Sequence, residues 1–281
     1  MRRGLGAAAL ALALCGASPR APLHLGPASV SHPARVVTLA PSLTEAVLAL
    51  GAGDRLVGVT RFDEAPEVKS VPRVGGYIDP SVEVVISLHP DLVIAEPSPG
   101  NRQAVEHIAD LGTPVLAVPL GTEEEIFAAL REVGRALGLA EQGAKLAEAT
   151  RGRLRAVRER ARPLPAVRVL IVNGWEPMVV AGPQSFGDML LSYVGAVNAA
   201  AGAKSPYPVF TAELAMQSAP QVVVDASAVA SSQRERILAL PGIDQARVVV
   251  ASPGLYHPGP RIAEAVEELF ALLHPAPARR P

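Results

Sequence analysis

Two glutamates occupy matched positions in the two halves of the sequence. Glu83 lies near the start of a helical pattern that ends at Pro90, and Glu213 lies near the start of one that ends at Pro220, with the same spacing from glutamate to proline. The helix dipole favours a carboxylate in the first turn by ~0.3–1 kcal/mol, so either glutamate alone has a local explanation. As a pair, two fixed carboxylates are suited to charge-assisted hydrogen bonds with arginine.

No catalytic or metal-binding signature accompanies these glutamates. The sequence contains no G-x-S-x-G, H-E-x-x-H, P-loop or G-x-G-x-x-G motif. Its six histidines are scattered, and its single cysteine cannot build a cysteine-based zinc or iron–sulfur site. We therefore expect a protein that is not an enzyme and that holds no catalytic residue, metal or resident cofactor.

The overall charge argues against a nucleic-acid partner, and the N-terminus indicates export. The 26 Lys and Arg residues balance 27 Asp and Glu residues, which gives no general attraction to nucleic acid or to an anionic membrane. Arg2 and Arg3 precede an apolar run, Leu5 to Leu14, of the length of a signal-peptide core. Cys15 follows where a bacterial lipoprotein signal carries its lipid, although Leu14 stands where a small residue is usual. Lipidation of Cys15 and its removal with the signal peptide both stay open.

Alternating strand and helix patterns fill both halves of the chain. Ser42 with Glu45, and Ser185 with Asp188, are spaced as capping boxes, each at the start of an apolar helical run. The alternation is typical of parallel sheets that are covered on both faces. Strands are expected at 35–40, 56–60, 92–95 and 114–118 in the first half and at 168–172 and 221–226 in the second.

A proline-free segment over residues 122–162 connects the halves. Gly138 divides it into two predicted helices, of which the second covers about 141–162 and would be about 33 Å long, close to the diameter of a lobe. A rigid helix of this kind indicates small rather than large closure between lobes. The predicted organisation is a signal peptide over 1–17, a flexible tether over 18–34, an N-terminal lobe over 35–121, connecting helices over 122–165, a C-terminal lobe over 166–274 and a tail over 275–281.

Together these features resemble the substrate-binding proteins of ABC importers with a helical backbone, which include periplasmic receptors for cobalamin, haem and ferric siderophores. The resemblance covers about residues 35–274. It implies an α/β fold of two pseudo-duplicated lobes with parallel-sheet cores, joined by a single long α-helix. The segments that carry it are RVVTLAPSLTEAVLALGAGDRLVGVT, VPRVGGYIDPSVEVVISLHPDLVIA, PYPVFTAELAMQSAPQVVV and PGPRIAEAVEEL. Within the group, VGGYIDPSVE and the PYP before Glu213 look most like the cobalamin-binding branch.

The resemblance also assigns roles to single residues. In this group one carboxylate on each lobe docks onto arginines of the membrane permease, and these carboxylates match Glu83 and Glu213. The ligand pocket is expected between the lobes, in loops that follow strands. Four aromatic residues stand in such loops: Phe62, Tyr77, Trp175 and Tyr207.

The positions of Phe62, Tyr77 and Tyr207 carry pocket aromatics in the cobalamin receptors that this chain resembles. Each ring alone has packing as its alternative, but as a group they would grip a large planar ligand such as a corrin or porphyrin. His257 lies in a loop that faces the ligand in the family, with an ordinary surface histidine as the alternative.

The implied function is the extracytoplasmic component of an ABC importer. It would bind cobalamin or a related corrinoid in the inter-lobe cleft and deliver it to a permease dimer with its ATPase subunits. We expect a monomer in the periplasm or on the outer face of the cytoplasmic membrane, touching that membrane only through a lipid on Cys15. Haem, with Tyr77 as its axial ligand, and ferric siderophores are the alternatives within the fold, and an enzyme is a remote one.

Overall fold

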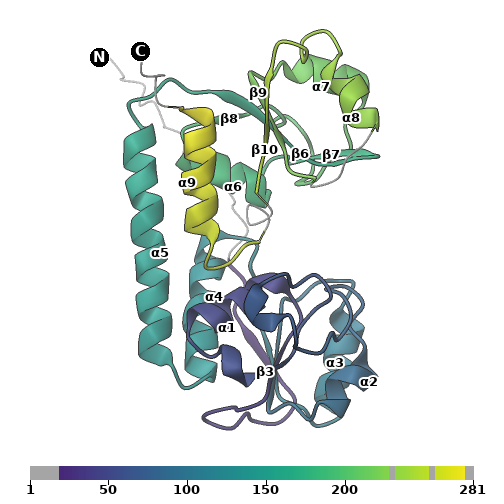
Figure 1. Ribbon diagram of the computed structural model, residues 1–281, viewed down its shortest axis with the longest axis vertical. Coiled ribbons are helices and arrows are strands. Elements are labelled where there is room, and N and C mark those ends of the chain that lie inside the picture. The colour runs from purple at the N-terminus through teal and green to yellow at the C-terminus, as the bar shows by residue number, and fades with distance from the viewer. Residues whose placement is uncertain (1–18, 228–231, 253–256, 276–281) are drawn as a thin grey trace, which may run out of the picture.

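The chain folds into two α/β lobes that are stacked along its long axis and connected along one side (Figure 1). The computed structural model describes residues 19–227, 232–252 and 257–275. The predicted signal peptide and Cys15 lie outside these described residues. The two-lobe α/β architecture predicted from the sequence is confirmed.

The first lobe is built on a five-stranded sheet whose three inner strands are parallel. Short runs of apolar, mostly β-branched residues form these inner strands, which are buried on both faces. Their carboxyl ends therefore meet at one edge of the sheet. The order across the sheet is β1 (Leu23–Leu25), β5 (Val115–Ala117), β4 (Leu92–Ala95), β2 (Val36–Thr38) and β3 (Leu56–Gly58).

Strand β1 corrects the predicted flexible tether over residues 18–34. It pairs antiparallel with β5, with His24 opposite Leu116, and so belongs to the first lobe. Two side-chain contacts hold this segment to the connecting helices: Arg20 bonds Glu125, and His24 Nε2 lies 2.9 Å from Glu132 Oε1. The prediction failed because a three-residue edge strand leaves no periodic signal.

Three helices and two 3-10 turns complete the first lobe: α1 (Pro41–Ala49), α2 (Val82–Ser87), α3 (Arg102–Asp110), η1 (Gly53–Arg55) and η2 (Pro66–Val68). The capping box predicted at Ser42 and Glu45 is absent, because α1 begins two residues earlier than that cap implies, at Pro41, with Ala40 as N-cap. The Glu45 carboxylate instead contacts His257 of the second lobe.

Two antiparallel helices connect the lobes: α4 (Glu123–Ala136) and α5 (Ala140–Ala161). Thr122 caps α4 by accepting a hydrogen bond from the amide of Glu125 at 3.2 Å. The 22 residues of α5 give it a length of about 33 Å, and it runs past both lobes, as predicted (Figure 1).

The second lobe repeats the parallel arrangement around strand β6 (Arg168–Trp175). β9 (Val222–Asp225) and β8 (Val197–Asn198) run parallel to β6, β10 (Arg247–Val250) runs parallel to β9, and β7 (Met178–Val180) runs antiparallel at the edge. Ser185 caps the first helix of this lobe, as predicted. The helices are α6 (Phe186–Tyr193), α7 (Ala212–Ser218), α8 (Ser232–Leu238) and α9 (Ile262–Leu273).

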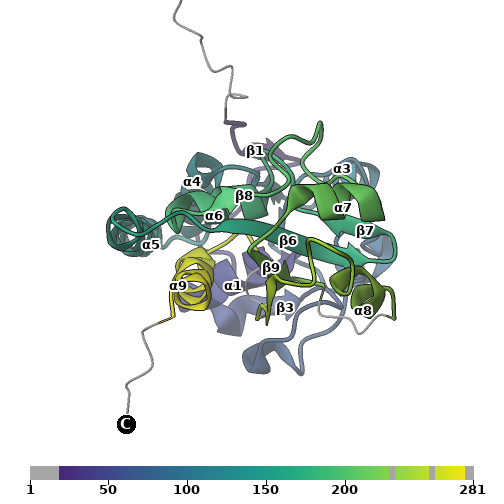
Figure 2. The same ribbon diagram turned by 90° about the horizontal axis from the view of Figure 1, so that it is seen from above.

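The hydrophobic core is continuous between the lobes. One cluster of buried side chains includes Val36 and Leu43 of the first lobe, Leu154 of α5, and Val169 and Val222 of the second lobe. The last helix, α9, packs against α5 (Figures 1 and 2), where Arg153 forms two hydrogen bonds with Glu267. Among the described residues, no helix is both long and apolar enough to cross a membrane.

Candidate functional site

A tight turn after β3 presents Phe62 at the carboxyl edge of the first sheet. The buried carboxylate of Asp63 accepts hydrogen bonds from the amide of Thr60 at 2.8 Å and from its hydroxyl at 2.6 Å. This closed turn leaves the Phe62 side chain 52% exposed, with the Arg61 guanidinium 4.9 Å from its ring centre. Because the buried polar turn holds the Phe62 ring outward, the ring offers an apolar surface for contact with another molecule.

Two glycines shape the loop that carries Tyr77. Gly75 has a φ of +105°, a conformation that side chains disfavour. A Cβ on Gly75 would also lie 2.6 Å from the backbone oxygen of Asp79, so that position needs glycine, whereas a Cβ on Gly76 would meet side-chain atoms of Asp79 and Arg61. The space is taken by the Arg61–Asp79 ion pair, at 2.9 Å, which ties this loop to the turn of Phe62.

Asn101 ties the same loop to the end of β4. Its fully buried side-chain amide donates to the carbonyl oxygens of Tyr77, at 3.0 Å, and of Glu96, at 2.8 Å. The half-buried Tyr77 ring packs against the central core cluster. Polar contacts thus join the loops that carry Phe62, Tyr77 and Glu96.

Burial and nearby charges shift the pKa of Glu96 and of Tyr77. Burial raises the pKa of Glu96 to about 7; the charge of Arg20 lowers it and that of Glu125 raises it. Burial and the charge of Glu96 raise the pKa of Tyr77, against a smaller opposing hydrogen bond from Ser98. The Tyr77 phenol therefore stays neutral, beside a glutamate that changes its charge near neutral pH.

In the second lobe Tyr207 is held in a loop beside β7. The amides of Val180 and Gly182 donate to the carbonyl oxygens of Pro208, at 3.1 Å, and Pro206, at 2.8 Å, on either side of Tyr207. The Tyr207 side chain is 54% exposed, and its hydroxyl lies 3.5 Å from the Phe186 amide at the start of α6. Helix α6 lies between the second sheet and the first lobe (Figure 1).

Trp175 does not share this exposed setting. It ends β6 in the core of the second lobe, 3% exposed, and its indole N–H donates to Asp225 Oδ1 at 3.0 Å. The Asp225 carboxylate also accepts from Ser227 at 2.8 Å and from Arg234 at 2.5 Å. Burial raises the pKa of Asp225, but these hydrogen bonds outweigh it and lower the pKa overall. The indole therefore has a structural partner and almost no free surface.

Comparison with known proteins identifies the family of this chain. The family model described as periplasmic binding protein matches residues 36–245. The chain belongs to the periplasmic binding protein family. It is 32% identical, over 87% of its length and 81% of the relative's, to the uncharacterized ABC transporter substrate-binding lipoprotein YvrC of Bacillus subtilis. The fold and family expected from the sequence are confirmed, and the family is one of binding and transport proteins.

Two solved structures show the same two-lobe arrangement as this periplasmic binding protein. The periplasmic vitamin B12 binding protein BtuF of Vibrio cholerae superposes with a TM-score of 0.75 at 26% identity, covering 86% of this chain and 96% of that one. The periplasmic heme-binding protein BhuT in complex with two hemes gives a TM-score of 0.76 at 29% identity, covering 85% and 97%.

Glu83 and Glu213 lie in equivalent settings on the two lobes. Ser81 and Thr211 are the N-caps of α2 and α7, and each hydroxyl accepts from a backbone amide three residues on, at 3.3 Å. Both carboxylates are exposed. Hydrogen bonds from its own backbone amide and from Ser81 lower the pKa of Glu83, and the Thr211 hydroxyl and its own amide lower that of Glu213. Helices α2 and α7 both lie on the side of the molecule opposite α5 (Figure 1).

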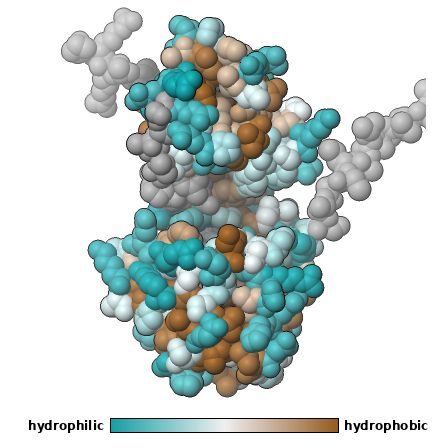
Figure 3. All heavy atoms as spheres, turned by 90° about the vertical axis from the view of Figure 1, so that its right-hand side faces the viewer, coloured by the Kyte–Doolittle hydropathy of each residue, from teal (hydrophilic) through white to brown (hydrophobic). Residues whose placement is uncertain are grey.

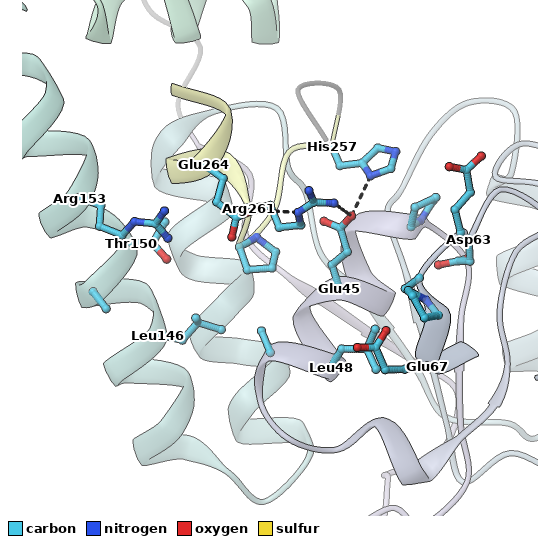
Figure 4. Close-up of a pocket in the computed structure, with 17 residues that line it drawn as sticks. Glu45, Leu48, Asp63, Glu67, Leu146, Thr150, Arg153, His257, Arg261 and Glu264 are labelled. Atoms are coloured by element: carbon cyan, nitrogen blue, oxygen red, sulfur yellow. Dashed lines mark hydrogen bonds and ion pairs between the residues drawn. The ribbon is translucent and has the colours of Figure 1, made fainter. Parts of the chain in front are cut away.

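His257 lies at the contact between the lobes, in the lining of a cavity that Asp63, the neighbour of Phe62, also lines. Its Nδ1 is 3.0 Å from Glu45 Oε1 on α1, at the edge of this cavity, of about 540 Å³, between α1, α5 and the start of α9 (Figure 4). The lining of this cavity does not include Phe62, Tyr77 or Tyr207. Within the described part of the chain, no three His, Cys, Asp or Glu side chains are grouped as a metal site would require.

Sequence reasoning missed three residues that shape the site. Glu96 directly follows the predicted strand 92–95, and this position at a strand end could have singled it out. Asn101 showed no signal, because one of its partners, the Tyr77 carbonyl, is 24 residues away in the sequence. Arg20 was hidden by the tether prediction, although its three hydrogen bonds to Glu125 hold the N-terminal segment near Glu96.

Proposed function

We propose that this protein is the extracytoplasmic receptor of an ABC importer for cobalamin or a related corrinoid. Phe62 and Tyr77 of the first lobe and Tyr207 of the second would contact the ligand between the lobes. Rigid rings can cover the apolar face of a corrin with little loss of conformational entropy. Trp175, whose side chain is 3% exposed, is left out of this contact.

Sequence likeness is the observation that favours a corrinoid over haem: a vitamin B12-binding protein of Pectobacterium atrosepticum is 25% identical over 89% of this chain and 92% of its own length. Burial and the charge of Glu96 raise the pKa of Tyr77, so in the absence of a metal the phenol is neutral and offers its ring for contact. His257 is engaged by Glu45 at 3.0 Å. A corrinoid brings its own metal ligands, so it needs only contact with the face of its ring. A neutral aromatic side chain can make that contact.

A calorimetric titration tests the ligand. The full-length protein should bind cyanocobalamin, and Tyr77→Ala or Tyr207→Ala should each weaken binding by roughly 5- to 150-fold, the cost of losing a buried aromatic contact. Trp175→Phe is the control, because the structure buries this side chain, and its affinity should stay within a few-fold. If haemin binds with a shifted Soret band that Tyr77→Ala removes, while no corrinoid binds, the haem alternative replaces this proposal.

Glu83 and Glu213 are proposed to dock the loaded receptor onto arginines of the permease. Their lowered pKa keeps both carboxylates charged, as an ion pair with arginine requires. Each is followed by an exposed aliphatic residue, Val84 at 37% and Leu214 at 44%, so each lobe offers a charge beside an apolar contact. On the face opposite α5, hydrophobic residues lie among hydrophilic ones on both lobes (Figure 3). The molecule is narrower between the two lobes than at either lobe.

An uptake assay separates docking from ligand binding. The double variant Glu83→Ala with Glu213→Ala should abolish uptake of the corrinoid in cells that depend on this receptor, while calorimetry shows unchanged affinity. The matched control, Glu106→Ala with Glu235→Ala, removes one exposed glutamate from a helix of each lobe elsewhere and should leave uptake intact. Loss of ligand affinity in the first double variant, with permease binding retained, would place these glutamates in the pocket instead.

A further inference from the structure

The segment of the second lobe that precedes α9 rests on helix α1 of the first lobe. His257 Nδ1 lies 3.0 Å from Glu45 Oε1, and an Arg261 guanidinium nitrogen lies 3.5 Å from the same oxygen (Figure 4). The Glu45 side chain is only 13% exposed. A carboxylate withdrawn this far from water needs its partners, because removal of one leaves a poorly solvated charge.

The backbones also meet at this point. Gly259 is buried, and a Cβ placed on it would lie 3.2 Å from both the Cβ and the carbonyl oxygen of Ser42, at the start of α1. Glycine therefore allows the second lobe to approach α1 closely enough for the polar contacts to form. The two lobes touch here through segments separated by more than two hundred residues.

The interface next to this contact is incompletely packed and contains a cavity. The cavity has a volume of about 540 Å³ and lies between α1, the 63–67 segment, α5 and the start of α9 (Figure 4). Oε2 of Glu45 is buried and has no hydrogen-bond partner within the described part of the chain. The polar contact therefore passes through the single oxygen that His257 and Arg261 share.

We propose that Glu45, His257 and Arg261 form a second inter-lobe connection that, together with α5, fixes the separation and orientation of the lobes. The continuous core and α5 join the lobes, and a polar contact between α1 and the segment before α9 adds a restraint on their tilt. Because α2 and α7 are carried by different lobes, the same contact positions Glu83 against Glu213. This last consequence rests on the proposed docking function, whereas the restraint on the lobes rests on the contacts alone.

A distance measurement between the lobes tests the proposal. Spin labels on Ser87→Cys in α2 and Gln217→Cys in α7 occupy exposed positions, and Cys15→Ser in the full chain leaves these two as the only thiols. Double electron–electron resonance without ligand should give one narrow distance distribution for the otherwise unchanged protein. Glu45→Gln, and separately Arg261→Gln, should broaden or shift it, and combining them should add little because both act on one contact.

The control is Glu267→Gln, which breaks the Arg153–Glu267 pair between α5 and α9 without touching α1. It should leave the distribution unchanged. Glu45→Gln retains the side-chain shape, and circular dichroism checks that it folds, with Tm lowered by about 2–4 °C. An unchanged distribution in folded Glu45→Gln and Arg261→Gln, or equal broadening in Glu267→Gln, overturns the proposal. Because no ligand is present, neither outcome depends on corrinoid binding.

Discussion

Glu96 keeps a proton on its carboxyl group at a pH where most glutamates have lost theirs. Burial at the end of β4 raises its pKa from an ordinary value of 4.5 to about 7. The unfolded chain releases this proton near pH 4.5 and the folded chain near pH 7, so the folded protein binds more protons between these values. Stability from this group is therefore complete below about pH 4.5 and falls as the pH rises towards 7.

Replacing Glu96 by glutamine removes the free-energy cost of holding an ionised carboxylate in a buried position. Glu96→Gln should raise the free energy of unfolding at pH 8 by roughly 1–3 kcal/mol and change it little at pH 4, where both folded and unfolded chains are protonated. Urea unfolding at the two pH values measures the difference. A gain of equal size at both would show that packing, and not ionisation, is responsible.

Single residues were the least predictable part of the site. We predicted Trp175 in a ligand-facing loop because it follows a predicted strand. Its indole N–H instead donates to Asp225, a partner fifty residues away. His257 was equally ambiguous, because only the packing of two lobes brings it to Glu45. Phe62 and Tyr207 were predicted in loops between the elements of each lobe, and the structure leaves both side chains exposed.

At the scale of elements, a close helix contact sets the connection between the lobes. Gly134 of α4 and Gly143 of α5 are both buried, and a Cβ on Gly134 would lie 2.7 Å from the Gly143 Cα and 2.9 Å from the Leu139 carbonyl oxygen. These neighbours are backbone atoms, which cannot turn aside as a side chain can. The antiparallel pair therefore depends on small residues where the helices meet.

Gly134→Ala should lower the free energy of unfolding by about 1–3 kcal/mol, the usual cost of overpacking. Gly152→Ala is a matched control on α5, because a Cβ there meets nothing within 4 Å. It should instead stabilise the protein, by up to about 1 kcal/mol, through improved helix propensity. Equal losses for both variants, measured by urea unfolding, would contradict the close contact.

Elements with strong local patterns were predicted well, and those fixed by distant partners were not. Strands β2, β4 and β5 lie within two residues of the predicted bounds, because short apolar runs between turn residues identify buried parallel strands. Helix α5 follows from a long proline-free segment. Strand β1 depends on the free edge of β5, and α1 begins before the expected cap, so neither could be read from local sequence.

At the scale of the whole molecule, the two lobes behave as one partly rigid unit. The continuous core, α5 and the contact of Glu45 with the second lobe all restrict closure. Lobes that close little favour a large, rigid ligand over a small one that needs enclosure by domain movement. The matched settings of Glu83 and Glu213 fit the same design, since two fixed lobes present two carboxylates at a constant spacing.

A crystal structure of the protein grown with cyanocobalamin tests the central claim most directly. The account predicts a corrin ring between the lobes, in contact with Phe62 and Tyr77 on one side and Tyr207 on the other, with Trp175 still bonded to Asp225. Cyanocobalamin in the cavity beside Glu45, or a complex that forms with haemin under the same conditions and never with a corrinoid, would contradict it.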